Sequence, residues 1–205
     1  MASFEARFEA ALCLAAQAHR GQSRKGTANA SGLALPYITH PVAVATLVQR
    51  HGGDAEQIIA ALLHDVLEDG GAYWAEPIAA GFGPEVLALV RFCTDGVPDA
   101  AGQKAPWRVR KEAYLAHLAQ ATGPGLLVSA CDKLANLQAI HLDRLECGAV
   151  VWSRFSAGRA GTLWYYGALV ETFVETFAGR LPAALEQALR REWAAVEVLA
   201  AEESP

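Results

Sequence analysis

The sequence predicts an all-α fold, and three observations support this prediction. Apolar residues make up 53% of the chain and charged residues 19%, which is typical of a globular protein rather than a disordered one. Alanine-rich segments are frequent, and alanine has the highest helix propensity. Runs of β-branched residues, which favour strands, are few. A chain of 205 residues is long enough for a sizeable core, and we expect residues 1–205 to form a single domain.

Apolar residues spaced three and four apart, together with capping residues, divide the chain into helices. Ser3 suits the N-cap of the first helix, and Gly21 suits its C-cap. Pro41 fits the first position of the next helix, so His40 is expected as its N-cap. The predicted helices cover residues 3–19, 41–50, 54–69, 75–83, 84–93, 107–120, 126–137 and 181–201, and the aromatic residues between 150 and 178 are expected in the core.

Charge, cysteine usage and hydropathy exclude several classes of function. The net charge of −5 gives no basic field for nucleic-acid binding, so an anionic substrate must be held by local cations or by a metal. The four cysteines are scattered and form no short framework, which favours reduced thiols in a cytoplasmic protein. The N-terminus does not resemble a signal peptide, and no apolar run is long enough to span a bilayer.

The most informative stretch of the chain covers residues 58–69. An apolar run, expected to be the buried part of a continuous helix, is followed within six positions by His64, Asp65, Glu68 and Asp69. Unpaired charge is costly to bury, so a divalent cation between these side chains would supply their missing partner. The alternative is a helix that leaves the core, with Glu68 and Asp69 in solvent.

A second informative stretch covers residues 126–137, where Asp132 interrupts a mostly apolar helix. Helical spacing places Asn136 on the same face as Asp132, whereas Lys133 is expected to point away from it. The buried carboxylate therefore needs another partner. A metal would satisfy it, and a salt bridge to a distant arginine is the alternative.

Four of these side chains are typical ligands of a divalent metal. His40, with apolar residues on both sides, is expected to point inward, and the four ligands would then come from three helices: His40, His64, Asp65 and Asp132. Two nitrogens and two oxygens suit manganese or iron and leave positions open for water. Metal-bound water becomes a nucleophile at neutral pH, and Glu68 or Asp69 would orient or deprotonate it.

Basic residues near this cluster would neutralise an anionic substrate. Arg24 and Lys25 begin a loop rich in small residues, and Lys133 follows Asp132, with Lys104, Arg108 and Lys111 as further candidates. A solvent-exposed loop is the alternative interpretation of the Arg24–Lys25 segment. Together with the metal ligands, these cations indicate metal-assisted hydrolysis of a phosphate ester or anhydride.

Five segments resemble the HD superfamily of metal-dependent phosphohydrolases, and in particular the hydrolase domains of RelA/SpoT-type alarmone enzymes and the small alarmone hydrolases of the Mesh type. In chain order they are AHRGQSRKGT, PYITHPVAVA, ALLHDVLEDG, GFGPEVLALVRFCTDG and CDKLANLQ, which together span about residues 10–140. The HD pair alone is a weak signal, whereas the ordered set is specific. The resemblance implies a helical bundle that the C-terminal helices of residues 150–201 complete.

The resemblance also implies the reaction and the roles of individual residues. It makes His40, His64, Asp65 and Asp132 ligands of Mn²⁺, and Glu68 and Asp69 the catalytic acids. It makes Arg24, Lys25, Asn136 and Tyr165 substrate-binding residues, and the charge argument above adds Lys133 to them. The implied reaction removes pyrophosphate from the 3′ position of (p)ppGpp and gives GDP or GTP. No synthetase domain follows, so we expect a hydrolase-only enzyme with a small nucleotide as substrate. We expect no nucleic-acid or membrane partner, and an oligomer is possible.

One departure from the family pattern affects the substrate. The loop of residues 26–35 is longer than the family's usual link, and Ala28 to Leu35 are expected to reshape the base pocket. Two alternatives therefore stay open. One is an HD phosphohydrolase for a deoxynucleotide, another 3′-phosphorylated nucleotide or NADPH, and the other is a catalytically silent nucleotide sensor.

Overall fold

A computed structural model describes residues 2–26, 32–99, 101–177 and 179–202. Within these ranges the chain is helical and has no strand, only an isolated bridge between Ser23 and Pro36. The α-helices are α1 (Phe4–Ala18), α2 (Thr39–Arg50), α3 (Ala55–Leu63), α4 (Val66–Gly70), α5 (Ala75–Phe82), α6 (Pro84–Cys93), α7 (Trp107–Ala119), α8 (Gly125–Cys147), α9 (Gly158–Glu171) and α10 (Ala183–Ala201). The short elements are η1 (Ala72–Trp74), η2 (Gly148–Arg154) and η3 (Thr172–Thr176). The predicted all-α fold is confirmed.

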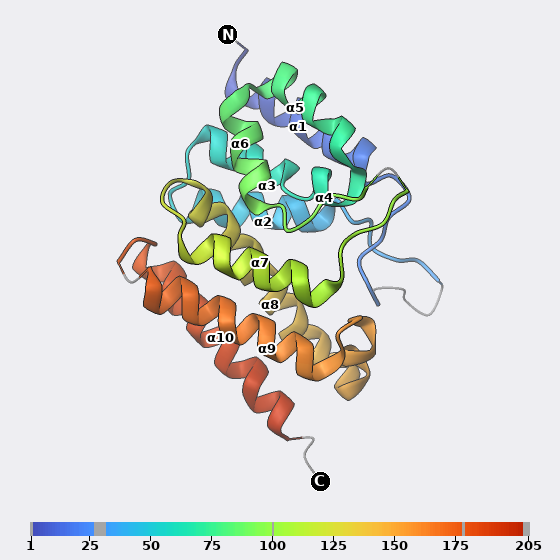
Figure 1. Cartoon of the computed structure of the whole chain (residues 1–205), viewed down its shortest axis with the longest axis vertical. Coiled ribbons are helices and arrows are strands. Elements are labelled where there is room, and N and C mark those ends of the chain that lie inside the picture. Colours follow the sequence, from blue (N-terminus) through green and yellow to red (C-terminus); the bar gives the residue numbers. More distant parts are fainter. Residues whose placement is uncertain (1, 27–31, 100, 178, 203–205) are drawn as a thin grey trace.

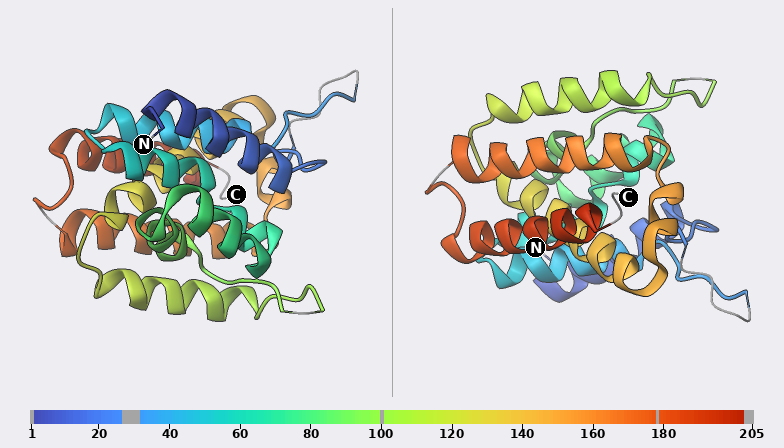
Figure 2. Two further views of the ribbon diagram at one scale, coloured as in Figure 1. Left: turned by 90° about the horizontal axis from the view of Figure 1, so that it is seen from above. Right: turned by 90° about the horizontal axis from the view of Figure 1, so that it is seen from below.

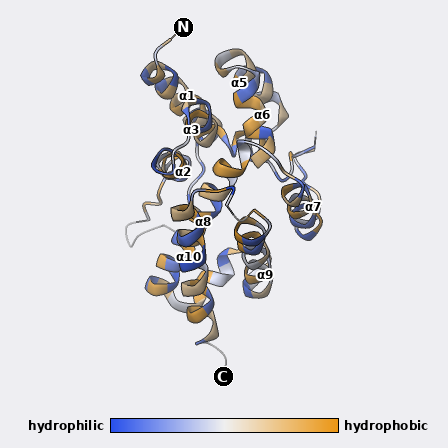
Figure 3. Ribbon diagram, turned by 90° about the vertical axis from the view of Figure 1, so that its left-hand side faces the viewer, coloured by the Kyte–Doolittle hydropathy of each residue, from blue (hydrophilic) through white to orange (hydrophobic). Residues whose placement is uncertain are grey.

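Helix α3 lies at the centre of the N-terminal part of the protein. It packs against α1, α2, α6 and α8 (Figure 1). Every residue from Gln57 to Leu63 is buried, because the run Ile58–Leu63 is apolar on all sides. The other helices carry both hydrophobic and hydrophilic residues around their circumference (Figure 3). Of these, α1, α2 and α6 each pack one face against α3.

Helix α8 connects the two halves of the molecule. It packs against α2, α3 and α6 on one side and against α9 and α10 on the other. Helix α7 lies alongside α9 (Figure 1). With 23 residues it extends far beyond the predicted segment of residues 126–137. Asp132 lies in the N-terminal half of α8, within the helix that joins the two halves of the molecule. None of the helices in the described ranges is long and apolar enough to cross a membrane.

The helix ends largely follow the predicted signals. The Ser3 side chain accepts a hydrogen bond from the Ala6 amide, and Asp54 forms a capping box with Gln57. Two predicted caps are wrong, because each helix boundary lies two residues earlier than the sequence indicates. Helix α2 begins at Thr39 with Ile38 as its N-cap, so His40 lies inside the first turn. Helix α1 ends with His19 as its C-cap, and Gly21 lies beyond it with a φ of 80°.

Candidate active site

The central helix is interrupted at His64 and Asp65. Helix α3 ends at Leu63 and α4 begins at Val66, so the prediction of one continuous helix through residue 69 is wrong. The ring of His64 explains the break, because its Nδ1 lies 2.8 Å from the carbonyl oxygen of Ala61. In a continuous α-helix the Asp65 amide would bond to that carbonyl. The break brings His64 and Asp65 to the same cluster, although they are adjacent in sequence.

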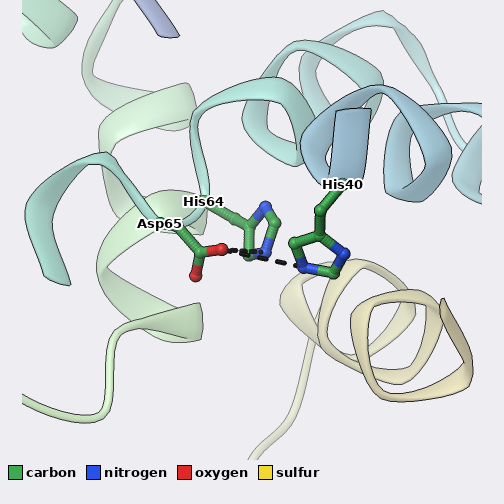
Figure 4. Close-up of side chains that lie close together, drawn as sticks. All are labelled: His40, His64 and Asp65. Atoms are coloured by element: carbon green, nitrogen blue, oxygen red, sulfur yellow. Dashed lines mark ion pairs between the residues drawn. The ribbon is translucent and has the colours of Figure 1, made fainter. Parts of the chain in front are cut away.

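Four side chains from separate segments converge at this break. His40 comes from α2, His64 and Asp65 from the α3–α4 junction, and Asp132 from α8. The ligand atoms of His40, His64 and Asp65 all lie within 4.8 Å of one another (Figure 4). Asp132 Oδ1 lies 3.1 Å from His40 Nε2 and 3.5 Å from His64 Nε2. The structure thus brings together all four predicted ligands.

The donor set fits a divalent cation. The Nδ1 of His64 donates to a carbonyl, which leaves the lone pair of Nε2 directed at carboxylate oxygens: Asp65 Oδ2 at 3.1 Å and Asp132 Oδ1 at 3.5 Å. Among the described residues this buried Nε2 has no hydrogen-bond partner. Neighbouring ligands of a metal bound at about 2.1 Å are about 3 Å apart, which matches these separations. A cation would therefore replace the repulsion between lone pairs with attraction.

Two further side chains hold the carboxylates of this cluster. The hydroxyl of Tyr37 donates to Asp65 Oδ2 at 2.6 Å, and the Asn136 amide donates to Asp132 Oδ1 at 2.7 Å. Asn136 lies on the face of α8 that spacing predicts. Tyr37 was not predicted as a site residue, since its partner is distant in sequence. Such outer contacts orient carboxylate ligands and maintain their ionised form.

The predicted direction of Lys133 is wrong. Its ammonium donates to Asp132 Oδ2 instead of pointing away from that residue. Lys133 is 12% exposed at its side chain, and a buried ammonium needs a counterion. The flexible side chain therefore folds back to the adjacent carboxylate. The Asp132 side chain in turn is engaged through both of its oxygens.

Glu68 and Asp69 follow the cluster on α4 and have different surroundings. Glu68 Oε1 lies 3.3 Å from Lys104 Nζ and 3.6 Å from an Arg110 nitrogen, while Asp69 Oδ1 lies 3.4 Å from Lys104 Nζ. Burial, together with the charges of Asp95 and Asp65, raises the pKa of Glu68 to about 7. Burial and Asp65 also raise the pKa of Asp69. Glu68 therefore has the pKa of a group that exchanges protons near neutral pH.

The raised pKa of Glu68 predicts that Glu68→Gln stabilises the metal-free protein at alkaline pH. A carboxyl group whose folded pKa exceeds its unfolded value of 4.5 destabilises the fold once it ionises, so this cost is absent below about pH 4.5 and complete above about pH 7. We expect a gain of about 1–3 kcal/mol at pH 8 that disappears at pH 4.5. Urea unfolding in the presence of chelator measures it. The exposed carboxylate of α10 provides the control Glu197→Gln, and an equal gain in that variant would contradict the prediction.

The cluster opens into a cavity of about 540 Å³. Of the predicted substrate-binding, catalytic and metal-binding residues, only Asp69 and His64 do not line it. The predicted residues that do line it are Arg24, Lys25, His40, Asp65, Glu68, Asp132, Lys133, Asn136 and Tyr165. Arg24 donates to the Asn136 side-chain oxygen at 3.3 Å, and its guanidinium lies 5.8 Å from the centre of the Tyr37 ring. Tyr165 lines the cavity, and its buried hydroxyl has no hydrogen-bond partner among the described residues.

A second cavity of about 300 Å³ adjoins the first and shares Lys25, Glu68, Lys111 and Tyr165 with it. Asp69 and Lys104 line this second cavity, so both predicted acids line it, whereas only Glu68 of the two lines the first. Of the further predicted cations, Lys111 lines both cavities and Lys104 the second. Arg108 lines neither, because its guanidinium lies on the Trp164 ring, 3.2 Å from the ring centre.

Asp95 is a residue of this region that the sequence did not reveal as functional. Its carboxylate accepts hydrogen bonds from Lys111 and Arg110, both on α7. Although burial opposes it, the charges of Lys111 and Arg110 lower the pKa of Asp95. The sequence predicts a turn at Asp95, and only its long-range partners indicate that it anchors two cations of the pocket.

The loop of residues 26–35, which is predicted to reshape the pocket, lies partly outside the described residues. Of its described part, Leu35 lines the cavity.

Known proteins are similar to this chain in sequence and in fold. A curated relative from Xenopus tropicalis, named guanosine-3′,5′-bis(diphosphate) 3′-pyrophosphohydrolase MESH1, is 33% identical over 141 residues, which cover 68% of this chain and 70% of the relative. A Haemophilus influenzae guanosine-3′,5′-bis(diphosphate) 3′-pyrophosphohydrolase is 43% identical over 102 residues, half of this chain but 13% of that protein. A solved structure described as a metazoan ortholog of SpoT that hydrolyses ppGpp matches 95% of this chain and 96% of its own, with a TM-score of 0.71 and 27% identity.

A family model also matches most of the chain. The model of the HD domain matches residues 11–163, which is more than half of the 205 residues and includes every residue of the metal cluster. The match agrees with the helical architecture and with the convergence of His64 and Asp65, the adjacent histidine and aspartate, on His40 and Asp132. The chain belongs to the HD domain family.

Proposed function

We propose that the protein hydrolyses the 3′-pyrophosphate of (p)ppGpp, giving GDP or GTP and pyrophosphate. One observation carries the proposal: two imidazoles and two carboxylates converge beside Glu68 at the wall of a cavity that Arg24, Lys25 and Lys111 also line. This arrangement suits a phosphorylated substrate and a hydrolytic reaction. Relatives from several organisms that carry the name of this activity support the same substrate.

In the proposed reaction the residues of the chain have separate roles. A divalent cation, for which the mixed nitrogen and oxygen donors favour Mn²⁺, would be held by His40, His64, Asp65 and Asp132 and supply a water of lowered pKa and a Lewis acid. Glu68 accepts a proton of the attacking water as the water oxygen bonds to the phosphorus on the ribose 3′-oxygen. The bond between this phosphorus and the 3′-oxygen breaks, and the 3′-oxygen takes up the proton from Glu68 as pyrophosphate is released. Lys25 and Lys111 balance the charge that develops on the phosphate oxygens, and the Tyr165 hydroxyl donates to one of them.

We also propose that residues 1–205 form a single HD domain. Residues 10–140 carry the motifs, and residues 150–201 complete the bundle, since α9 and α10 pack on the same helix α8 that carries Asp132. The four cysteines, all without a disulfide, favour the cytoplasm.

The proposed function is tested by pyrophosphate release from ppGpp by the purified protein, with Mn²⁺ or with chelator. A deoxynucleotide panel and NADPH serve as competing substrates. We expect Mn²⁺-dependent release with ppGpp preferred. Turnover of another phosphate in place of ppGpp would contradict the substrate, and a bound metal without turnover of any of them would contradict the enzymatic function.

Arg24→Ala is expected to weaken substrate binding more than it slows chemistry. The guanidinium lies beside Asn136 and Tyr37 at the cavity wall, where it is suited to stack on a base or approach a phosphate. Loss of such a contact corresponds to an increase in KM of about tenfold with kcat changed by less than about threefold. Steady-state kinetics with ppGpp measures both constants. Arg20→Ala removes an exposed cation just beyond the end of α1 and should leave KM unchanged, whereas an unchanged KM in Arg24→Ala would refute the role.

A further inference from the structure

The end of the cavity that is remote from the metal cluster holds an ion pair for which the proposed reaction has no role. Arg154 Nη1 lies 2.7 Å from Asp143 Oδ2, and both residues line the cavity. Asp143 is on α8 and Arg154 at the end of η2. We propose that Asp143, positioned by Arg154, recognises the base of the substrate and selects guanine. This inference rests on the proposed function and specifies the residue that determines the base.

The charges along the cavity indicate which end takes the base. Next to Glu68, Lys25 and Lys111 line the wall, and the adjoining cavity adds Lys104 and Arg110. The remote end instead carries the Asp143–Arg154 pair and the carboxylate of Glu146, beside the apolar side chains of Ile140 and Leu142. Phosphate groups are therefore attracted to the first end, whereas at the other end Arg154 is already paired with Asp143 and Glu146 repels them. An uncharged, planar base suits the remote end.

Helix α8 sets the distance between the metal cluster and Asp143. Asp132, Asn136, Ala139 and Asp143 follow one another at spacings of three and four, and all line the cavity. Eleven residues from Asp132 to Asp143 correspond to about 16 Å along the helix. Both carboxylates lean toward the N-terminus of α8, so this separation also applies to their oxygens. A nucleoside whose 3′-phosphate lies at the cluster would thus bring its base edge to Asp143.

Arg154 holds Asp143 in place and also contacts the substrate-binding loop. Its guanidinium lies so close to Gly26 that a Cβ at that position would be 2.0 Å from Arg154 Nε, and Gly26 has a φ of 71°. Arg154 Nη2 also donates to Cys147 Sγ at 3.1 Å. The segment after α1 and η2 lie at the same end of the molecule in both views of Figure 2. A carboxylate fixed in this way loses little side-chain entropy on binding a base.

The chemistry of a fixed carboxylate distinguishes guanine from adenine. Guanine presents two adjacent donors, N1–H and the N2 amino group, which one carboxylate accepts together in charge-assisted hydrogen bonds. Adenine presents a lone pair at N1, which a carboxylate repels. A carboxylate at the base edge therefore both favours guanine and disfavours adenine. Asn at the same position supplies a donor and an acceptor and removes this preference.

The test compares ppGpp with its adenosine counterpart in the wild-type protein, in Asp143→Asn and in Asp143→Ser. Initial rates with Mn²⁺ give kcat/KM for each substrate, and equilibrium binding of the two nucleotides in chelator gives a second measurement that requires no turnover. The control is Glu56→Gln, because Glu56 is also paired with an arginine, Arg7 at 2.8 Å, and its side chain is likewise 30% exposed. Glu56 does not line the cavity.

We expect the wild-type protein and Glu56→Gln to prefer the guanosine substrate. Both Asp143 variants should lose about 10- to 100-fold in kcat/KM for ppGpp with no loss for the adenosine substrate. The adenosine rate shows that the variants are folded. An unchanged guanine-to-adenine ratio in both variants would overturn the inference. If the wild-type protein hydrolyses neither nucleotide, the proposed function fails, and the ratio of the two binding constants still decides the role of Asp143.

Discussion

Asp65→Ala is expected to abolish both Mn²⁺ binding and turnover of ppGpp. Asp65 Oδ2 lies 3.1 Å from His64 Nε2 and 3.7 Å from His40 Nε2, so it is a carboxylate shared by both imidazoles. Its loss leaves two neutral rings and Asp132 as ligands, and the charge that attracts a cation is halved. A metal contributes several kcal/mol of transition-state stabilisation, which corresponds to a loss of at least about 1,000-fold in kcat/KM.

Calorimetric titration with Mn²⁺ and pyrophosphate release from ppGpp measure the two effects of Asp65→Ala. Asp65→Asn is a second variant, since the amide oxygen still accepts the hydrogen bond of Tyr37 and maintains local packing. It should lose nearly as much as Asp65→Ala, because the charge rather than the shape is missing. Glu85→Ala removes an exposed carboxylate from α6 and should behave as wild type. Turnover by Asp65→Ala within tenfold of the wild-type rate would exclude Asp65 as a ligand.

The positions of the helices were predictable because their signals are local. Capping residues, prolines and apolar spacing lie within a few residues of the boundaries that they set, as at Ser3, Asp54 and Pro84. The convergence of His40, His64, Asp65 and Asp132 was also predictable, since each is an ionisable residue in an apolar helical context. The break between α3 and α4 was not, because it depends on the competition of the His64 ring for a backbone carbonyl.

The contacts that orient the site depend on residues far apart in sequence. Tyr37 and Asp65 are separated by 28 positions, and Arg24 and Asn136 by 112, so no spacing rule relates them. Lys133 shows a different limit. A helical wheel gives the direction in which its Cβ leaves the helix, whereas the buried ammonium moves to the nearest counterion, Asp132. Sequence patterns thus indicate which side chains share a site and not how each of them is engaged.

Glu68→Gln is expected to lower kcat by about 100- to 10,000-fold while Mn²⁺ still binds, because general acid–base catalysis contributes a factor of this size. Glu68 lines both cavities beside Asp65, whereas Asp69 lines only the second one and pairs with Lys104. Asp69→Asn should therefore cost less, about tenfold. The difference separates a proton acceptor from a residue that positions a cation.

The pH dependence provides the decisive measurement for Glu68. A base must be ionised to accept a proton, so kcat/KM of the wild-type protein should fall as the pH drops through the pKa of Glu68, which is about 7 in the metal-free protein. Glu68→Gln has no such group, and its residual activity should lack this acid limb, whereas Asp69→Asn should retain it. An acid limb that persists unchanged in Glu68→Gln would assign the proton transfer to another residue. Loss of Mn²⁺ binding in Glu68→Gln would instead place Glu68 among the metal ligands, because only a ligand or its support affects both binding and rate.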